Sequence, residues 1–193
     1  MILQTQAIYS QMVRSTSRWM EIPILIGFNL LLVASAYVSI TLPFSPVPIT
    51  GQSFGVLLIA MALGRVRATA IVAAYLMEGA AGLPVFAGGA FGAQHLVGPT
   101  GGYLIGFLAA AFMVGAMADK GWDRSYFRSI IAMTVGHAII FACGIVWLAP
   151  FIPSEGLLAA GLTPFLLGTA IKTGLASFCL PTAWKAISRD DSH

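Results

Sequence analysis

Charge is what this sequence has least of. Asp, Glu, Lys and Arg together make up 9% of its 193 residues, whereas hydrophobic residues make up 58% and the mean hydropathy is +0.88. A soluble globular domain carries about 25% charged residues, so this chain lacks the charge to cover a surface in water. Because a spanning helix takes roughly 20 residues, six helices would nearly use up the chain. The composition excludes an ordinary soluble protein and predicts a single membrane domain.

Cysteines and catalytic signatures are scarce as well. Cys143 and Cys179 lie in apolar segments without C-x-x-C or Cys/His spacing, and we interpret them as small buried hydrophobic side chains. The sequence contains no P-loop motif, no H-E-x-x-H and no G-x-S-x-G. Its positive residues are scattered and form no nucleic-acid-binding patch. We therefore expect no metal, no cofactor, no nucleic-acid partner and no enzymatic activity.

Six apolar segments, separated by proline, glycine or charged residues, have the composition of membrane spans. We expect an all-α integral membrane protein, a bundle of six transmembrane helices at 22–42, 52–64, 66–83, 101–118, 127–149 and 162–187. Three parts follow from these bounds, namely a cytoplasmic or interfacial segment at 1–21, the membrane domain at 22–187 and a cytoplasmic tail at 188–193.

The positive residues predict the orientation of the bundle. The loops 43–51, 84–99 and 150–161 contain no Lys or Arg. Nine of the ten fall on the opposite side in this scheme, namely Arg14, Arg18, Arg65, Arg67, Lys120, Arg124, Arg128, Lys185 and Arg189. Since positive residues accumulate on the cytoplasmic side of a membrane, both termini are predicted to be cytoplasmic.

Lys172, the tenth positive residue, lies about two turns inside the last span. A buried ammonium at this depth is costly, so such a side chain faces the bundle interior or a cavity, where it could hold an anion such as a carboxylate. The alternatives are outward snorkelling past Gly168 and an internal pair with Glu78. Glu78 itself, near the outer end of the third span, is as consistent with a solvated carboxylate as with a site residue.

Two connections on the side without positive charge have an unusual composition. Residues 46–52 read Pro-Val-Pro-Ile-Thr-Gly-Gln, and residues 83–103 are uncharged but rich in glycine, proline and aromatics. Exposed turns, the alternative interpretation, usually carry more Asp, Asn and Ser. Irregular backbone near a membrane must pack on protein or line a cavity. We expect the two connections to form a lid over a pocket, with His95 as a loop residue.

Small residues recur at helical spacing in the first span. Gly27, Ser35 and Ser39 would share one face of a helix that reaches residue 42. Such faces allow helices to approach closely. They predict either packing within the bundle or docking of another membrane subunit.

The motifs of the uncharged connections resemble those of the BioY family, the biotin-binding substrate components of energy-coupling-factor transporters. The resemblance covers roughly residues 22–185 and rests on the 46–52 segment, on Tyr75-Leu with Gly79 and Gly82-Leu-Pro-Val-Phe86, and on Gly98-Pro-Thr-Gly-Gly-Tyr-Leu104. It implies a six-helix bundle in a prokaryotic inner membrane that binds biotin near its outer face. It also implies a transmembrane coupling protein and two cytoplasmic ATPase subunits as partners, or a homo-oligomer in members that work alone.

In the family, the last helix carries a Gly-Asp-x-x-Lys pattern whose polar residues contact biotin. The matching segment here is Gly168-Thr169-Ala170-Ile171-Lys172, which keeps the lysine and has Thr169 in place of the acid. Lys172 would pair with the carboxylate of biotin, and Glu78 is a candidate to receive its ureido N–H groups. The predicted biotin-binding residues are Lys172, Thr169, Glu78, Tyr75, Gln52, Thr50, Phe86, Gly98 and Tyr103.

Two other functions are weighed against biotin transport. One is a substrate component of the same architecture for a different vitamin, against which the outer motifs argue. The other is an intramembrane enzyme with Lys172 or His95 as catalytic base. Such an enzyme needs a nucleophile beside its base, and the sequence shows no such pair.

Overall fold

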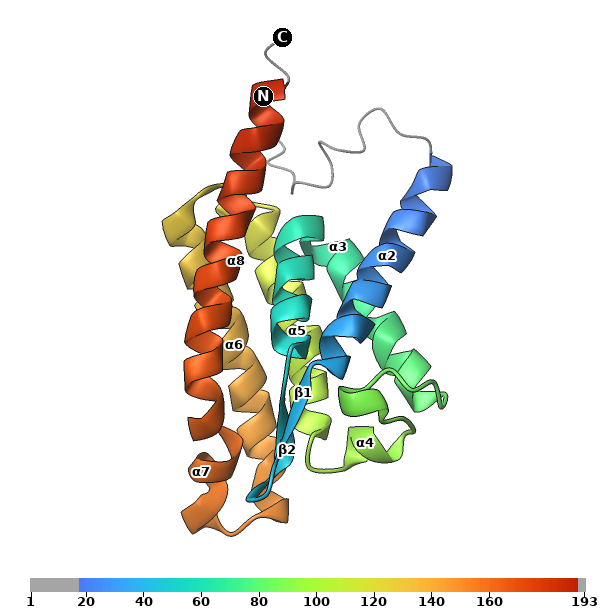
Figure 1. Ribbon diagram of the computed structural model, residues 1–193, viewed down its shortest axis with the longest axis vertical. Helices are drawn as coiled ribbons and strands as arrows, with labels where there is room; N and C mark the ends of the chain where they lie inside the picture. The colour runs from blue at the N-terminus through green and yellow to red at the C-terminus, as the bar shows by residue number, and fades with distance from the viewer. Residues whose placement is uncertain (1–17, 191–193) are drawn as a thin grey trace.

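The computed structural model describes the backbone of residues 18–190 and the side chains of residues 21–182 (Figure 1). Arg14 and most of the predicted terminal segments lie outside the described residues, and so do the side chains of Arg18, Lys185 and Arg189. The main elements are α2 (Arg18–Tyr37), β1 (Ser39–Leu42), β2 (Ser45–Thr50), α3 (Gln52–Ala80), α4 (Gln94–Val97), α5 (Gly101–Ala118), α6 (Tyr126–Leu148), α7 (Leu157–Gly161) and α8 (Thr163–Asp190).

The second and third predicted spans form one element, α3, which bends sharply at Gly64. Gly64 has φ +77° and ψ −179°, a combination that is essentially restricted to glycine. Figure 1 shows the two halves of α3 running in opposite directions, with the teal half rising and the green half descending. With α2, α5, α6 and α8, the two halves give the six-helix architecture that the sequence predicts. Four of the described helices are long and apolar enough to cross a membrane, and the stretch 21–37 is a shorter apolar helix.

Contacts with α2 establish the path of α3. Near the start of α3, a side chain added at Gly55 would meet Ser35. Beyond the bend, Arg67 pairs with Glu21 at 2.9 Å, and further along Glu78 accepts a hydrogen bond of 3.2 Å from Asn29. The first half of α3 therefore runs antiparallel to α2, and the second half returns parallel to it.

A β-hairpin replaces the end of the first predicted span, so the expectation that this helix reaches residue 42 is wrong. Helix α2 ends at Tyr37, and β1 pairs antiparallel with β2, with Ser39 opposite Thr50 and Leu42 opposite Ser45. The proline-rich stretch forms β2 because a two-stranded sheet leaves one side of each strand unpaired, where a missing N–H costs nothing. Within β1, Ser39 and Leu42 are half-buried, whereas Ile40 and Thr41 are exposed.

The β-hairpin also separates the three small residues, Gly27, Ser35 and Ser39, that were predicted to share one docking face. Ser39 belongs to β1 and Ser35 lies against the start of α3, where its hydroxyl donates to the carbonyl of Leu32 at 2.6 Å. Gly27 has no neighbour within 4 Å of an added side chain. The three residues therefore do not share one exposed helix face.

The buried core lies where α3 packs against α5 and α6, with fully buried Val72, Val114 and Met133. Helix α8 lies at the periphery. It turns Leu175 and Phe178 outward and Ala176 inward, as expected for a helix that faces lipid on one side. Cys179 is also exposed, contrary to its predicted burial, and Cys143 is half-buried.

The two ends of the bundle differ in composition. The start of α2 and the end of α8 lie at one end, and the hairpin, α4 and α7 lie at the other (Figure 1). The bend of α3 and the α5–α6 connection also lie at the first end, where the backbone N–H of Arg65 donates to the Asp119 carboxylate at 3.2 Å. We call this end, with Glu21, Arg65, Arg67, Asp119 and Lys120, the charged end; the hairpin end lies opposite.

Candidate functional site

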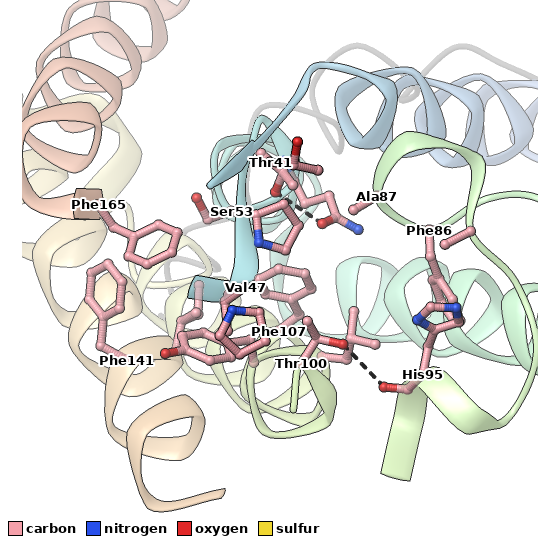
Figure 2. Close-up of a pocket in the computed structure, with 18 of the residues that line it drawn as sticks. Thr41, Val47, Ser53, Phe86, Ala87, His95, Thr100, Phe107, Phe141 and Phe165 are labelled. Atoms are coloured by element: carbon pink, nitrogen blue, oxygen red, sulfur yellow. Dashed lines mark hydrogen bonds between the residues drawn. The ribbon is translucent and has the colours of Figure 1, made fainter. Parts of the chain in front are cut away.

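A cavity of about 270 Å³ opens at the hairpin end of the bundle. This size lies near the lower limit of small-molecule sites, roughly 300–1,000 Å³. Its walls come from segments far apart in the sequence, namely the hairpin, the start of α3, the 86–100 connection, α5, α6 and α8 (Figure 2). The apolar part of the wall is formed mainly by Val47, Phe86, Leu104, Phe107, Ile140, Phe141 and Phe165.

Lys172 is part of the cavity wall and is held in place by hydrogen bonds. Its Nζ donates to the backbone carbonyl of Thr50 at 2.6 Å and to the hydroxyl of Ser53 at 3.1 Å. An ammonium has three donors, so these bonds leave one for a ligand. No Asp or Glu is found among the residues that line the cavity, and no ion pair is formed by Lys172 within the described side chains. The cavity is therefore a cationic site with an apolar wall.

A short polar network fixes the turn on which Lys172 rests. The hydroxyl of Thr50 donates to Gln52 Oε1 at 2.9 Å, and Gln52 Nε2 donates to the hydroxyl of Tyr75. Thr50 ends β2 and Gln52 begins α3, so the network joins the hairpin to the second half of α3. Gln52 and Tyr75 are both buried. The network thus holds the Thr50 carbonyl where it accepts the bond from Lys172.

The structure brings six of the nine predicted biotin-binding residues to the cavity wall, namely Lys172, Thr169, Gln52, Thr50, Phe86 and Tyr103. Tyr75 lies directly behind Gln52. Glu78 is not part of the wall, and the internal pair with Lys172 that the sequence allowed is not formed, because the Glu78 carboxylate is bonded to Asn29. The carbonyl of Gly98 accepts a 3.1 Å bond from the indole N–H of Trp147, which anchors the 86–100 connection.

Both segments predicted as a lid lie against the cavity. From the hairpin, Thr41 and Val47 reach the wall, and from the 86–100 connection, Phe86, Ala87 and Thr100 do so (Figure 2). Each segment is tied to the bundle by a hydrogen bond. The hydroxyl of Ser45 donates to the backbone carbonyl of Ala160 at 2.8 Å. The hydroxyl of Tyr37 donates to the backbone carbonyl of Pro84 at 2.6 Å.

Several wall residues were missed by reasoning from the sequence. His95, expected as a loop residue, lies on α4 with its ring centroid 6.1 Å from that of Phe86 (Figure 2). Among the described residues, no group of three or more potential metal ligands occurs. Ser53 could have been found, because it directly follows Gln52. Phe107, Phe141 and Phe165 could not, because a phenylalanine that faces a cavity and one that faces lipid look the same in a sequence.

Comparisons with known proteins agree on one group. The sequence model described as the BioY family matches residues 10–189. The chain is 41% identical over 151 residues to the biotin transporter BioY of Thermotoga maritima, covering 78% of this chain and 87% of the relative. It is 34% identical over 156 residues to the probable biotin transporter BioY of Pyrococcus horikoshii, covering 81% and 91%.

A solved structure also matches. The fold superposes with a TM-score of 0.77 on the crystal structure of an S-component for biotin from an ECF-type ABC transporter. The two chains are 27% identical, and the match covers 89% of this chain and 95% of the solved one.

Proposed function

Because the chain belongs to the BioY family, we propose that it is the biotin-binding subunit of a biotin uptake transporter, a multi-pass membrane protein that captures biotin in the cavity at its hairpin end. The relatives are named biotin transporters and the superposed structure is a biotin S-component. They favour biotin over other vitamins. A transporter S-component is not an enzyme, and the enzyme alternative is set aside.

The observation that carries the proposal is the chemistry of the cavity wall, which holds one cation, no carboxylate and many apolar side chains. Biotin has an apolar bicycle, a ureido group and a carboxylate at the end of a flexible chain. In the proposed pose, the free donor of Lys172 binds the carboxylate and the aromatic wall covers the bicycle. With no acid in the wall, neutral oxygens receive the ureido N–H groups.

Thr169 is the proposed acceptor for one of these N–H groups. It lines the cavity one turn of α8 from Lys172, and its hydroxyl forms no hydrogen bond within the described part of the chain. Replacing Thr169 with the isosteric Val should weaken biotin binding by about 3- to 10-fold, the effect of losing one neutral hydrogen bond of roughly 0.5–1.5 kcal/mol. Calorimetric titration measures the dissociation constant for biotin. An unchanged value in Thr169→Val would show that Thr169 does not accept a hydrogen bond from biotin.

Glu78 gives the opposite expectation. Because its carboxylate is bonded to Asn29 and lies outside the wall, Glu78→Gln should change the binding free energy by less than about 0.5 kcal/mol, the range of uninvolved sites. Titration of this variant with biotin is the measurement. A loss of affinity above this limit, in a variant whose elution volume in size-exclusion chromatography and Tm match those of the wild type, would restore Glu78 as the acceptor of the ureido N–H groups.

The orientation and the partners are parts of the same proposal. The charged end is proposed to face the cytoplasm of a prokaryotic cell, following the positive-inside rule, so the cavity opens outward from the inner membrane. A transmembrane coupling protein and two ATPase subunits are the proposed partners, or a homo-oligomer if the protein works alone. Gly27, on the open side of α2, is the proposed point of close approach for such a subunit.

Uptake by cells tests the proposal directly. A biotin auxotroph that lacks its own transporter and expresses this chain should accumulate labelled biotin at nanomolar concentrations. Excess unlabelled biotin should abolish the signal, and excess thiamine or riboflavin should not. No uptake with or without coexpressed ATPase subunits, in cells that contain the folded protein, would contradict the function. Competition by thiamine or riboflavin would assign the pocket to another vitamin.

A further inference from the structure

A second group of polar side chains lies directly beneath the cavity, between α6 and α8. His137 of α6 is 2% exposed, and its Nδ1 lies 2.9 Å from the carbonyl of Met133 and 3.4 Å from the hydroxyl of Thr173. Thr173 directly follows Lys172. On the cavity side, the His137 ring stacks at 28° on Phe141, which belongs to the cavity wall. The polar group therefore begins one helical turn below the binding site.

The group continues toward the charged end. Helices α6 and α8 run antiparallel, because His137 meets Thr173 and, nearer the charged end, the hydroxyls of Tyr126 and Thr182 lie 3.4 Å apart. Ser177 is one turn beyond Thr173 and is 3% exposed. A polar line thus runs along this interface from Lys172 through His137 to Ser177.

Two atoms in this line are buried and have no hydrogen-bond partner within the described part of the chain, namely Nε2 of His137 and Oγ of Ser177. A buried polar atom without a partner is costly, and more so at membrane depth, where bulk water cannot reach it. Native proteins satisfy such atoms with ordered water when the site is polar and offers several partners. Thr173 lies beside His137 and one turn of α8 from Ser177, and its hydroxyl adds a further polar group, so the interface has the chemistry of a water site.

We propose that ordered water occupies the α6–α8 interface at His137, Thr173 and Ser177, forming a hydrated extension beneath the biotin pocket. One turn of helix is about 5.4 Å, so a single bridging water or a pair spans the distance between successive polar side chains. Helix α8 carries Lys172 and Thr169. At the proposed water site, α8 contacts α6 through polar groups and water and not through apolar side chains alone. The proposal does not depend on the identity of the ligand in the pocket.

Cysteine accessibility in the membrane tests the proposal. In a background with Cys143 and Cys179 replaced by Ala, Ser177→Cys should be oxidised to the sulfenic acid by hydrogen peroxide, an oxidant little larger than water, because only a hydrated thiol forms the reactive thiolate. The matched controls are Ala176→Cys, at a position with 0% exposure that faces the apolar core, and Leu175→Cys, on the exposed outer side. We expect Ser177→Cys to react at least about tenfold faster than either control. Equal rates in variants that elute as folded protein would overturn the proposal.

A second variant keeps the test decisive if the cysteine variant does not fold. Ser177→Ala removes only the unpartnered hydroxyl. If water is bound there, Ser177→Ala loses a hydrogen bond and should lower Tm by roughly 2–4 °C, the shift for about 1 kcal/mol in a chain of this size. If the interface is dry, removal of an unsatisfied polar atom leaves Tm unchanged or raises it, and the proposal fails.

Discussion

Replacement of Lys172 with Met is expected to weaken biotin binding by about 30- to 150-fold, the largest effect on affinity of any single change in the cavity. Lys172 is the cation of a wall that contains no acid, and two hydrogen bonds already fix its ammonium. A hydrogen bond to a charged group contributes roughly 1.5–3 kcal/mol, and 2–3 kcal/mol corresponds to this loss of affinity. Calorimetric titration of the purified variant measures it.

Two controls separate recognition of the carboxylate from damage to the site. The wild-type protein should bind biotin methyl ester about 30- to 150-fold more weakly than biotin, whereas Lys172→Met should bind the two equally. Lys120→Met removes the same charge at the charged end and should leave affinity unchanged. If Lys172→Met and the wild type bind biotin with the same affinity, the proposed role of Lys172 is wrong.

Replacement of Gly64 with Ala is expected to cause the largest loss of stability. Gly64 has φ +77° and ψ −179°, and an alanine held in this region is strained by about 1–3 kcal/mol. The strain cannot relax easily, because the backbone at Gly64 and Arg65 lies in close contact with Gly115 of α5. Using the soluble-protein relation of about 2–4 °C for each kcal/mol, we expect Tm in detergent to fall by several degrees.

Gly27→Ala is the matched control for Gly64→Ala. Gly27 lies within α2 and an added side chain there meets nothing within 4 Å, so its replacement should leave Tm unchanged or raise it slightly. Equal Tm values for wild type and Gly64→Ala would contradict the sharp bend of α3. Equal losses in the two variants would show a general sensitivity to alanine and not strain at the bend.

The six helices could be predicted because apolar length and charge are properties of the sequence itself. The prediction for 101–118 agrees with α5 at both ends, and those for 127–149 and 162–187 differ from α6 and α8 by a few residues. The bend of α3 was placed correctly as a boundary near Gly64, because two arginines follow it. The two spans form one bent element because of the backbone angles of Gly64. The composition of the sequence does not reveal these angles.

The hairpin was missed for a physical reason. Residues 39–42, Ser-Ile-Thr-Leu, carry no charge, and hydropathy cannot distinguish a helix in lipid from a strand that covers a cavity. Only the proline-rich 46–52 segment marked a departure from helix. Likewise, the placement of Glu78 beside Asn29 depends on how α2 crosses the second half of α3, which no local pattern contains.

The positions of Lys172 and its companions in the cavity were more predictable. A lone cation at membrane depth needs a polar surrounding, and the structure provides the Thr50 carbonyl and the Ser53 hydroxyl. The aromatic wall and His95 join the site only through folding, because they come from segments that the sequence separates widely.

Calorimetric titration of the wild-type protein, purified in detergent, with biotin is the most direct test of the central claim. We expect saturable binding of one biotin per chain, with no heat of binding for thiamine or riboflavin under the same conditions. Absence of saturable biotin binding by protein that elutes as a single folded species, or binding of another vitamin in its place, would contradict it.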